Sequence, residues 1–167
     1  MTSGPTAVAG ARWARANDMA QVDLGFVRRL VAADHGLAVI ASTRRDGSIQ
    51  ASVVNAGVLD DPITDRPTVG LVAGGSTVKL RLLRRTGRAT IVFRAGWEWA
   101  AVEGPVRLIG PDDVPDGFAI ERVPQLLRDV FTAAGGTHED WDEYDRVMAR
   151  ERRTAVLVDP TRILGNR

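Results

Sequence analysis

The residue whose type and position could do chemistry is Lys79, in the first turn of a helix predicted to begin near Val78. Ser76 or Thr77 can cap this helix, because a hydroxyl there accepts a hydrogen bond from an N–H group that lacks a partner in the first turn. That turn lies at the positive end of the helix dipole, yet it carries Lys79 and Arg81 and no acid. A bound phosphate would remove the conflict, since free amides, dipole and lysine can converge on one anion. The alternative is that both side chains point into water, at a cost of roughly a few tenths of a kcal/mol.

Other chemistry finds little support in the sequence. His35 and His138 are the only histidines, no ligand spacing surrounds them, and cysteine is absent, so we predict no metal site. No Ser-His-Asp arrangement or G-x-S-x-G motif is present, and the glycines before Lys79 form neither a P-loop nor G-x-G-x-x-G. We therefore assign no catalytic residue, and if the protein is an enzyme a cofactor carries the chemistry.

The composition describes a folded chain of ordinary charge. Its 167 residues are 44% hydrophobic and 26% charged, with a formal net charge of +1, which fits one globular domain and no dominant nucleic-acid surface. Residues 1–18 are expected to form a mobile tail and residues 19–167 a single domain. With no apolar run long enough to span a bilayer and no signal-peptide pattern, we expect no membrane association and a cytoplasmic location.

The elements that must position Lys79 are mostly strands. The predicted order of strands and helices gives a mainly β fold with a largely antiparallel sheet, and such sheets remove their edges by closing into a barrel. The predicted elements are a helix over 19–33 capped by Asp18, strands over 36–42, 48–59 and 68–73, the basic helix, strands over 88–94 and 97–109, a helix over 121–134, a helix capped by Thr137, a strand over 155–158 and a tail over 161–167.

The hairpin before the basic helix offers polar groups on one face. Asp46-Gly47 predicts a type I′ turn, because glycine accepts the positive φ that this turn requires. In the strand that follows, alternation separates an apolar face from one with amide and hydroxyl groups, which could also be just the solvent side. The first face holds Ile49, Ala51 and Val53, and the second holds Gln50, Ser52 and Val54.

Most of residues 20 to 110 resemble the pyridoxamine-phosphate-oxidase-like split β-barrel family, which holds flavin- and deazaflavin-binding proteins. The matching segments are Arg45-Asp46-Gly47, Thr77 to Arg81 continuing to Ala89, Gly96-Trp97 and Ala101 to Gly104. The C-terminal series His138 to Tyr144 with Met148, followed by Arg152-Arg153, is similar to a branch of actinobacterial F420-dependent enzymes.

This resemblance implies a fold and a cofactor site. It implies a mostly antiparallel split β-barrel of the FMN-binding type, in which Lys79 holds the cofactor phosphate. Thr77 stands where relatives often carry arginine, which leaves one fewer charge for the phosphate. Gln50 and Ser52 would line the cofactor groove, and backbone groups near Ala101 would approach the cofactor. Homodimers with cofactors at the subunit interface are implied.

The function implied is hydride transfer from reduced F420 to an unsaturated or conjugated small molecule. Arg81, Arg45 and Arg84 are candidates for binding the acidic tail of the coenzyme, and Asn55 is a candidate for positioning its ring. One alternative is an FMN-binding oxidase or flavin reductase. A second is a non-catalytic protein that binds a flavin, F420 or a tetrapyrrole.

Overall fold

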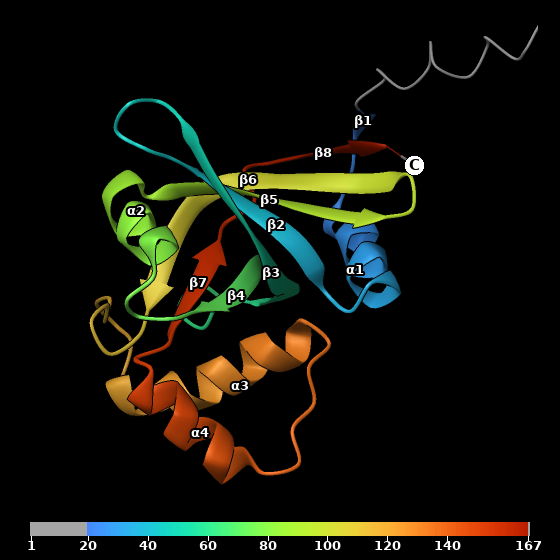
Figure 1. Cartoon of the computed structure of the whole chain (residues 1–167). Coiled ribbons are helices and arrows are strands. Elements are labelled where there is room, and N and C mark those ends of the chain that lie inside the picture. Colours follow the sequence, from blue (N-terminus) through green and yellow to red (C-terminus); the bar gives the residue numbers. More distant parts are fainter. Residues whose placement is uncertain (1–19, 167) are drawn as a thin grey trace, which may run out of the picture.

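Six antiparallel strands close into a barrel in the computed structural model, which describes residues 20–166 (Figure 1). The strands are β1 (Ala20–Gln21), β2 (Leu37–Thr43), β3 (Ile49–Asp60), β4 (Pro67–Ala73), β5 (Arg88–Ala95), β6 (Glu98–Ile109), β7 (Thr154–Val158) and β8 (Arg162–Asn166). The helices are α1 (Leu24–Ala33), α2 (Val78–Thr86), η2 (Ile120–Arg122), α3 (Val123–Ala133) and α4 (Trp141–Arg150). The predicted mobile tail over 1–18 lies outside the described residues.

Closure of the barrel depends on β7. The strands follow the order β6-β5-β2-β3-β4-β7, and β7 pairs with β6 as well as with β4. The first part of β6 pairs instead with β8, which carries β1 on its other side. The structure therefore confirms the predicted mainly β split barrel.

Two apolar cores hold the helices to the barrel. The first fills the barrel interior, where Phe26 of α1 and Leu80 and Leu83 of α2 are fully or almost fully buried. These two helices lie at opposite ends of the barrel (Figure 1). The second core lies between α3, α4 and the outer face of the sheet, and includes Leu127 and Leu157. Every residue of β7 is buried because the strand is covered on both faces, which fits the apolar run that follows Thr154.

Two predictions at the chain ends are wrong. Helix α1 begins at Leu24 rather than at Met19, with Asp23 as its cap: the carboxylate accepts a hydrogen bond from Phe26 N at 2.8 Å. The preceding residues pair with β8 as a strand. The predicted tail over 161–167 contains strand β8, which pairs with β6 through five residues. Its few apolar residues and its glycine give little strand signal.

Two local details also differ from prediction. In the hairpin turn only Gly47 has a positive φ, of 83°, and its N–H bonds to Arg44 O at 3.1 Å. A type I′ turn needs two such residues, so this is a type I turn closed by a left-handed glycine. Helix α4 is capped by Asp140 rather than Thr137, because Asp140 accepts a hydrogen bond from Glu143 N at 2.9 Å.

Membrane insertion through a helix is not supported by the helix lengths. The longest helix between residues 20 and 166 is α3 with 11 residues, and none of the helices described could cross a bilayer.

Gly57 allows α3 to dock against β3, and its replacement tests that contact. A methyl group at Gly57 would lie 2.0 Å from Ala133 O at the end of α3. We expect Gly57→Ala to lower the free energy of unfolding by about 3 kcal/mol, because two backbones would have to separate. At about 3 °C per kcal/mol for this chain length, the Tm measured by circular dichroism falls by roughly 10 °C.

Gly74→Ala is the matched control, since the nearest atom to its added methyl group would be the Thr77 methyl carbon at 3.4 Å. The two variants should therefore differ clearly in Tm. Equal melting temperatures would show that α3 is not held at Gly57.

Candidate functional site

Strand pairing brings the start of α2 next to a segment from the far end of the chain. Strands β4 and β7 are antiparallel with Ala73 opposite Thr154, so Gly74 after β4 lies beside Arg153 before β7. A methyl group at Gly74 would be 3.9 Å from Arg153 Nε. At Gly75 a methyl group would meet Arg152 O at 2.7 Å, and Gly75 N donates to Glu151 O at 3.2 Å. The glycine turn is therefore pressed against the turn between α4 and β7.

Helix α2 begins with a cap that leaves two backbone donors unused. The Thr77 hydroxyl accepts from Leu80 N at 3.3 Å and donates to Gly74 O at 2.9 Å. Thr77 is therefore the cap, and its hydroxyl is fully engaged. The N–H groups of Val78 and Lys79 make no hydrogen bond within residues 20–166. Together with the helix dipole they can receive an anion.

Lys79 is charged in an environment that disfavours its charge. Burial, and secondly the positive charge of Arg153, lower the pKa of Lys79 below its ordinary value of 10.5. None of the ion pairs in the described part of the chain includes Lys79. Arg153 pairs with Glu151, with an Nη2–Oε2 distance of 2.7 Å. An anion between the two cations would relieve the repulsion between Lys79 and Arg153 and stabilise the charged lysine.

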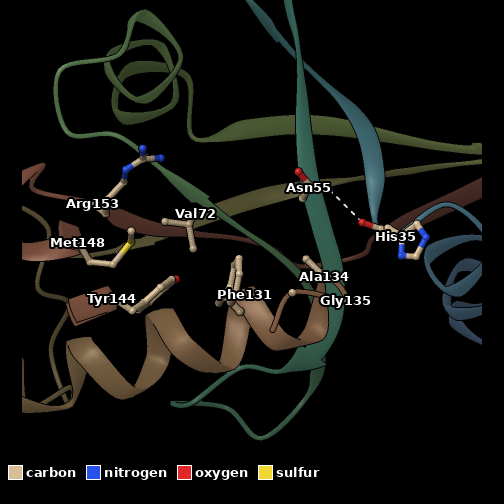
Figure 2. Close-up of a pocket in the computed structure, with 11 residues that line it drawn as sticks. His35, Asn55, Val72, Phe131, Ala134, Gly135, Tyr144, Met148 and Arg153 are labelled. Atoms are coloured by element: carbon tan, nitrogen blue, oxygen red, sulfur yellow. Dashed lines mark hydrogen bonds between the residues drawn. The ribbon is translucent and has the colours of Figure 1, made fainter. Parts of the chain in front are cut away.

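Two cavities meet at Arg153. One, of about 430 Å³, lies between the glycine turn and the end of α4, and is lined by Ser76, Thr77 and Arg150 among others. The other, of about 390 Å³, runs from Arg153 past Val72 and Phe131 towards the start of β2 (Figure 2). Lys79 lines neither cavity, but its charge interacts with that of Arg153. The arrangement joins a cationic cleft to a mainly apolar pocket.

The walls of the apolar pocket come from β3, β4, α3 and α4. Tyr144 lines the pocket, and its hydroxyl donates a hydrogen bond to Leu127 O at 3.1 Å. Burial raises the pKa of Tyr144 to about 12, so this phenol stays protonated at neutral pH. At the opposite end from Arg153, Asn55 Nδ2 donates to His35 O at 2.9 Å (Figure 2). Asn55 keeps its side-chain oxygen available to a ligand.

Gln50 and Ser52 are not brought to this pocket. They lie opposite Ser42 and Ile40 in the register of β2 and β3, on the face that turns into the barrel. Gln50 Oε1, Ser52 Oγ and Ser42 Oγ are buried, and none of them has a hydrogen-bond partner among residues 20–166. The polar face of this strand is thus the inner one, and the apolar face is the outer one.

The remaining predicted residues are dispersed. Arg81 and Arg45 are exposed, line neither cavity and form no ion pair among the described residues. Arg84 is engaged by Asp113, with an Nη2–Oδ2 distance of 2.7 Å. Ala101 lies on the outer face of β6, opposite Val92. Among the predicted binding residues, Ser76, Thr77 and Asn55 line the two cavities, and Lys79 is linked to them through its charge interaction with Arg153.

Ala101 belongs to an apolar row that crosses five strands on the outside of the barrel. The strand registers place its members directly opposite one another, in the order Val53, Val39, Val92, Ala101 and Leu164. Val53 is 67% exposed and nearby Ile49 is 59% exposed. Val39 is 38% exposed, whereas Ala101 is only 9% exposed, so the exposed part of the row lies over β2 and β3. Large apolar patches of this kind are seldom left in water by monomeric proteins. Asn55 lies two residues from Val53 on the same outer face, so the row reaches the edge of the apolar pocket.

Arg150 is a functional candidate that the sequence analysis does not identify, and Arg153 enters there only as part of the C-terminal series, without a binding role. At the end of a helix both residues are ordinary, because basic side chains there interact favourably with the dipole. Arg152, which lies between these two residues in the sequence, has a positive φ of 50°, and the chain turns there before Arg153. Only the pairing of β4 with β7 reveals this placement.

The pKa of Lys79 predicts how anion binding depends on pH. Binding needs the charged lysine, so affinity is present below the pKa of Lys79 and is lost as the pH rises through it. Because that pKa is lowered, the affinity for FMN, measured by fluorescence titration, should begin to fall at a lower pH than an ordinary lysine would give. Lys79→Arg keeps its charge throughout this range, and its affinity should not fall. Parallel pH profiles for the two proteins would exclude Lys79 as an anion ligand.

Comparison with solved structures identifies the same architecture. A conserved hypothetical protein from Mycobacterium tuberculosis is 15% identical with a TM-score of 0.62, over 88% of this chain and 85% of that one. A pyridoxamine 5'-phosphate oxidase-related, FMN-binding protein from Nostoc punctiforme is 14% identical with a TM-score of 0.59, over 83% and 80%. An F420 reductase is 13% identical with a TM-score of 0.53, over 80% and 92%.

The neighbours thus include a pyridoxamine 5'-phosphate oxidase-related, FMN-binding protein and an F420 reductase, and this chain shares their split-barrel fold. No protein-family model matches the sequence. Identities this low show a common fold, while function must be argued from the site itself.

Proposed function

We propose that this protein is an F420-dependent reductase, which transfers a hydride from the reduced deazaflavin coenzyme to an unsaturated or conjugated small molecule. The observation that carries the proposal is the half-buried Lys79 beside Arg153 at a helix start with two free N–H groups. These groups suit a phosphate monoester or diester, which is the anion that both F420 and FMN would present there.

The residues of the two cavities would divide the work of binding. Lys79 and Arg153 hold the phosphate, assisted by the N–H groups of Val78 and Lys79. The apolar pocket beside Val72 and Phe131 receives a flat ring system and keeps water from it, and Asn55 orients the ring from the far end. Reduced F420, when bound, would supply the hydride from its own ring, and the acceptor would take the accompanying proton from solvent, so no catalytic acid is assigned to the protein.

The acidic tail of F420 would lie in the cationic cleft. Arg150 lines this cleft beside Ser76 and forms no ion pair within residues 20–166. We therefore add Arg150 to Arg81 and Arg45 as a candidate for the tail carboxylates. Arg84 is a weaker candidate, because it would have to leave Asp113.

We propose further that a second copy of the chain packs on the apolar row around Val53 and Ala101. Exposure of Val53 and Val39 in this row supports the proposal, since burying them in a dimer removes apolar surface from water. The row also borders Asn55 at the end of the pocket. A partner on this face would complete the pocket wall, which places the cofactor at the subunit interface.

FMN is the alternative cofactor, and the FMN-binding neighbour of the same fold favours it. FMN has a phosphate but no acidic tail. Charge reversal by Arg150→Glu should therefore weaken F420 binding and leave FMN binding nearly unchanged. Lys79→Ala should weaken both.

The deciding experiment is a fluorescence titration of the purified protein with F420 and, separately, with FMN. We expect F420 to bind at about micromolar concentration or below, FMN to bind more weakly, and the Arg150→Glu and Lys79→Ala variants to respond as described. Selective FMN binding would instead favour an oxidase or flavin reductase. Tight binding without turnover of any conjugated acceptor would indicate a binding protein, and no binding of either would reject the proposal.

A further inference from the structure

A third cavity lies behind the side chain of Met148. Its volume is about 220 Å³, and it opens between η2, the start of α3 and the end of α4. Its walls are mainly apolar and include Ile120, Val123, Leu127 and Ala149. Nothing in the binding of phosphate or ring described above makes use of this cavity.

Met148 and Arg153 separate this cavity from the apolar pocket, since these two residues line both. Figure 2 shows them side by side at the end of the pocket nearest the phosphate site. Methionine is unbranched and has three rotatable bonds, so it can change rotamer at little cost. Rotation of Met148 would join the cavity behind it to the pocket.

The lining of this cavity does not favour a polar ligand. Its two charged residues are engaged elsewhere: Asp145 pairs with Arg128, at 2.6 Å between Oδ2 and Nη2, and Arg153 pairs with Glu151 and is assigned above to the cofactor phosphate. None of the buried polar side-chain atoms that lack a partner in residues 20–166 belongs to its lining. A polar group entering it would lose water without gaining a hydrogen bond, whereas an alkyl group gains from burial.

We propose that the cavity behind Met148 receives an apolar tail of the small-molecule acceptor, and that Met148 is the side chain that admits it. The inference rests on the proposed reductase function, and it narrows the acceptor to a conjugated head group with an extended alkyl or aryl substituent. The head lies in the apolar pocket and the tail passes Met148 towards Leu127. Each methylene of the tail that is buried raises affinity about fourfold.

Binding of the tail can be tested without any cofactor. The sequence has three methionines, at positions 1, 19 and 148, so the methyl resonance of Met148 in a ¹³C-methyl-labelled protein is assigned with a single variant, Met148→Leu. We expect n-octanol to shift this resonance saturably, with at least tenfold higher affinity than n-butanol. Equal affinities for the two alcohols would overturn the proposal.

Ala149 offers a variant that fills only this cavity, because it lines the cavity behind Met148 but not the pocket. Ala149→Leu should weaken n-octanol binding at least tenfold, while Ala149→Ser, similar in size to the native residue, should not. Position 149 is exposed on helix α4, and leucine is a good helix former. Unchanged n-octanol binding in Ala149→Leu, with a native melting temperature, would place the alcohol elsewhere.

Measurements of turnover then test whether the acceptor places its tail in this cavity. Among alkyl-substituted conjugated enones, Ala149→Leu should lower kcat/KM for a long-tailed member at least tenfold and leave a short-tailed one within twofold. Equal losses for both would overturn the assignment. If neither F420 nor FMN binds but n-octanol shifts Met148, the proposed function fails while the cavity remains an apolar binding site, so the two failures are distinguishable.

Discussion

The double variant Lys79→Ala/Arg153→Ala is expected to bind F420 and FMN at least a hundredfold more weakly than the native protein. A hydrogen bond to a charged group contributes about 1.5 to 3 kcal/mol, and each variant removes one such partner of the phosphate. Each single variant should therefore lose about tenfold or more. Fluorescence titration at one fixed ionic strength measures all four proteins.

Removing either cation also removes the electrostatic repulsion that it exerts on the other cation, and this gives a second measurable effect. Arg153 lowers the pKa of Lys79, so Arg153→Ala should raise that pKa and shift the alkaline loss of FMN binding to higher pH. Arg88→Ala serves as a control of equal charge, since Arg88 is exposed and lies at the opposite end of α2. Equal weakening by Arg88→Ala and Arg153→Ala would mean that only the overall charge matters.

The variant Val53→Asp is expected to be a monomer under conditions in which the native protein is a dimer. Val53 is 67% exposed within one chain, so the substitution leaves the barrel core intact. In a symmetric interface the substitution buries two carboxylates in apolar surroundings, at a cost of roughly several kcal/mol. We expect this cost to exceed the free energy that the apolar contact contributes to dimerisation. Light scattering coupled to gel filtration measures the mass directly.

Val114→Asp is the matched control, because Val114 is 46% exposed but lies in the loop after β6, away from the row. It should remain dimeric. We also expect Val53→Asp to bind cofactor more weakly, since the partner would complete the pocket at Asn55. A native protein that is monomeric at high concentration would refute the proposed interface.

Much of the fold can be predicted from the sequence because its signals are local. The apolar run of β7 and the glycine-led turn before α2 act over a few residues, and the structure confirms both. Strand β8 escapes prediction because its pairing with β6, rather than its own composition, makes it a strand. The start of α1 is displaced because two residues predicted as helix pair with β8.

The candidate site is predicted only in part, because pairing between strands that lie far apart in the sequence brings some of its residues together. The conflict between the helix dipole and Lys79 is visible in the sequence, and so is the Thr77 cap. Arg153 joins Lys79 through the register of two strands that lie far apart in the chain. Alternation separates the faces of β3 correctly, but it does not tell which face turns inward. In the structure the face with Gln50 and Ser52 is the inner one.

Closure of the barrel by β7 also determines when this chain can fold during its synthesis. A nascent polypeptide that ends before Thr154 leaves the hydrogen-bonding edges of β4 and β6 open, because β7 is the strand that joins them. At translation rates of about 5 to 20 residues per second, the edge of β4 waits on the order of ten seconds for its partner. The barrel therefore cannot close before β7 has been synthesised, and until then the open edges of β4 and β6 are available for strand-mediated aggregation.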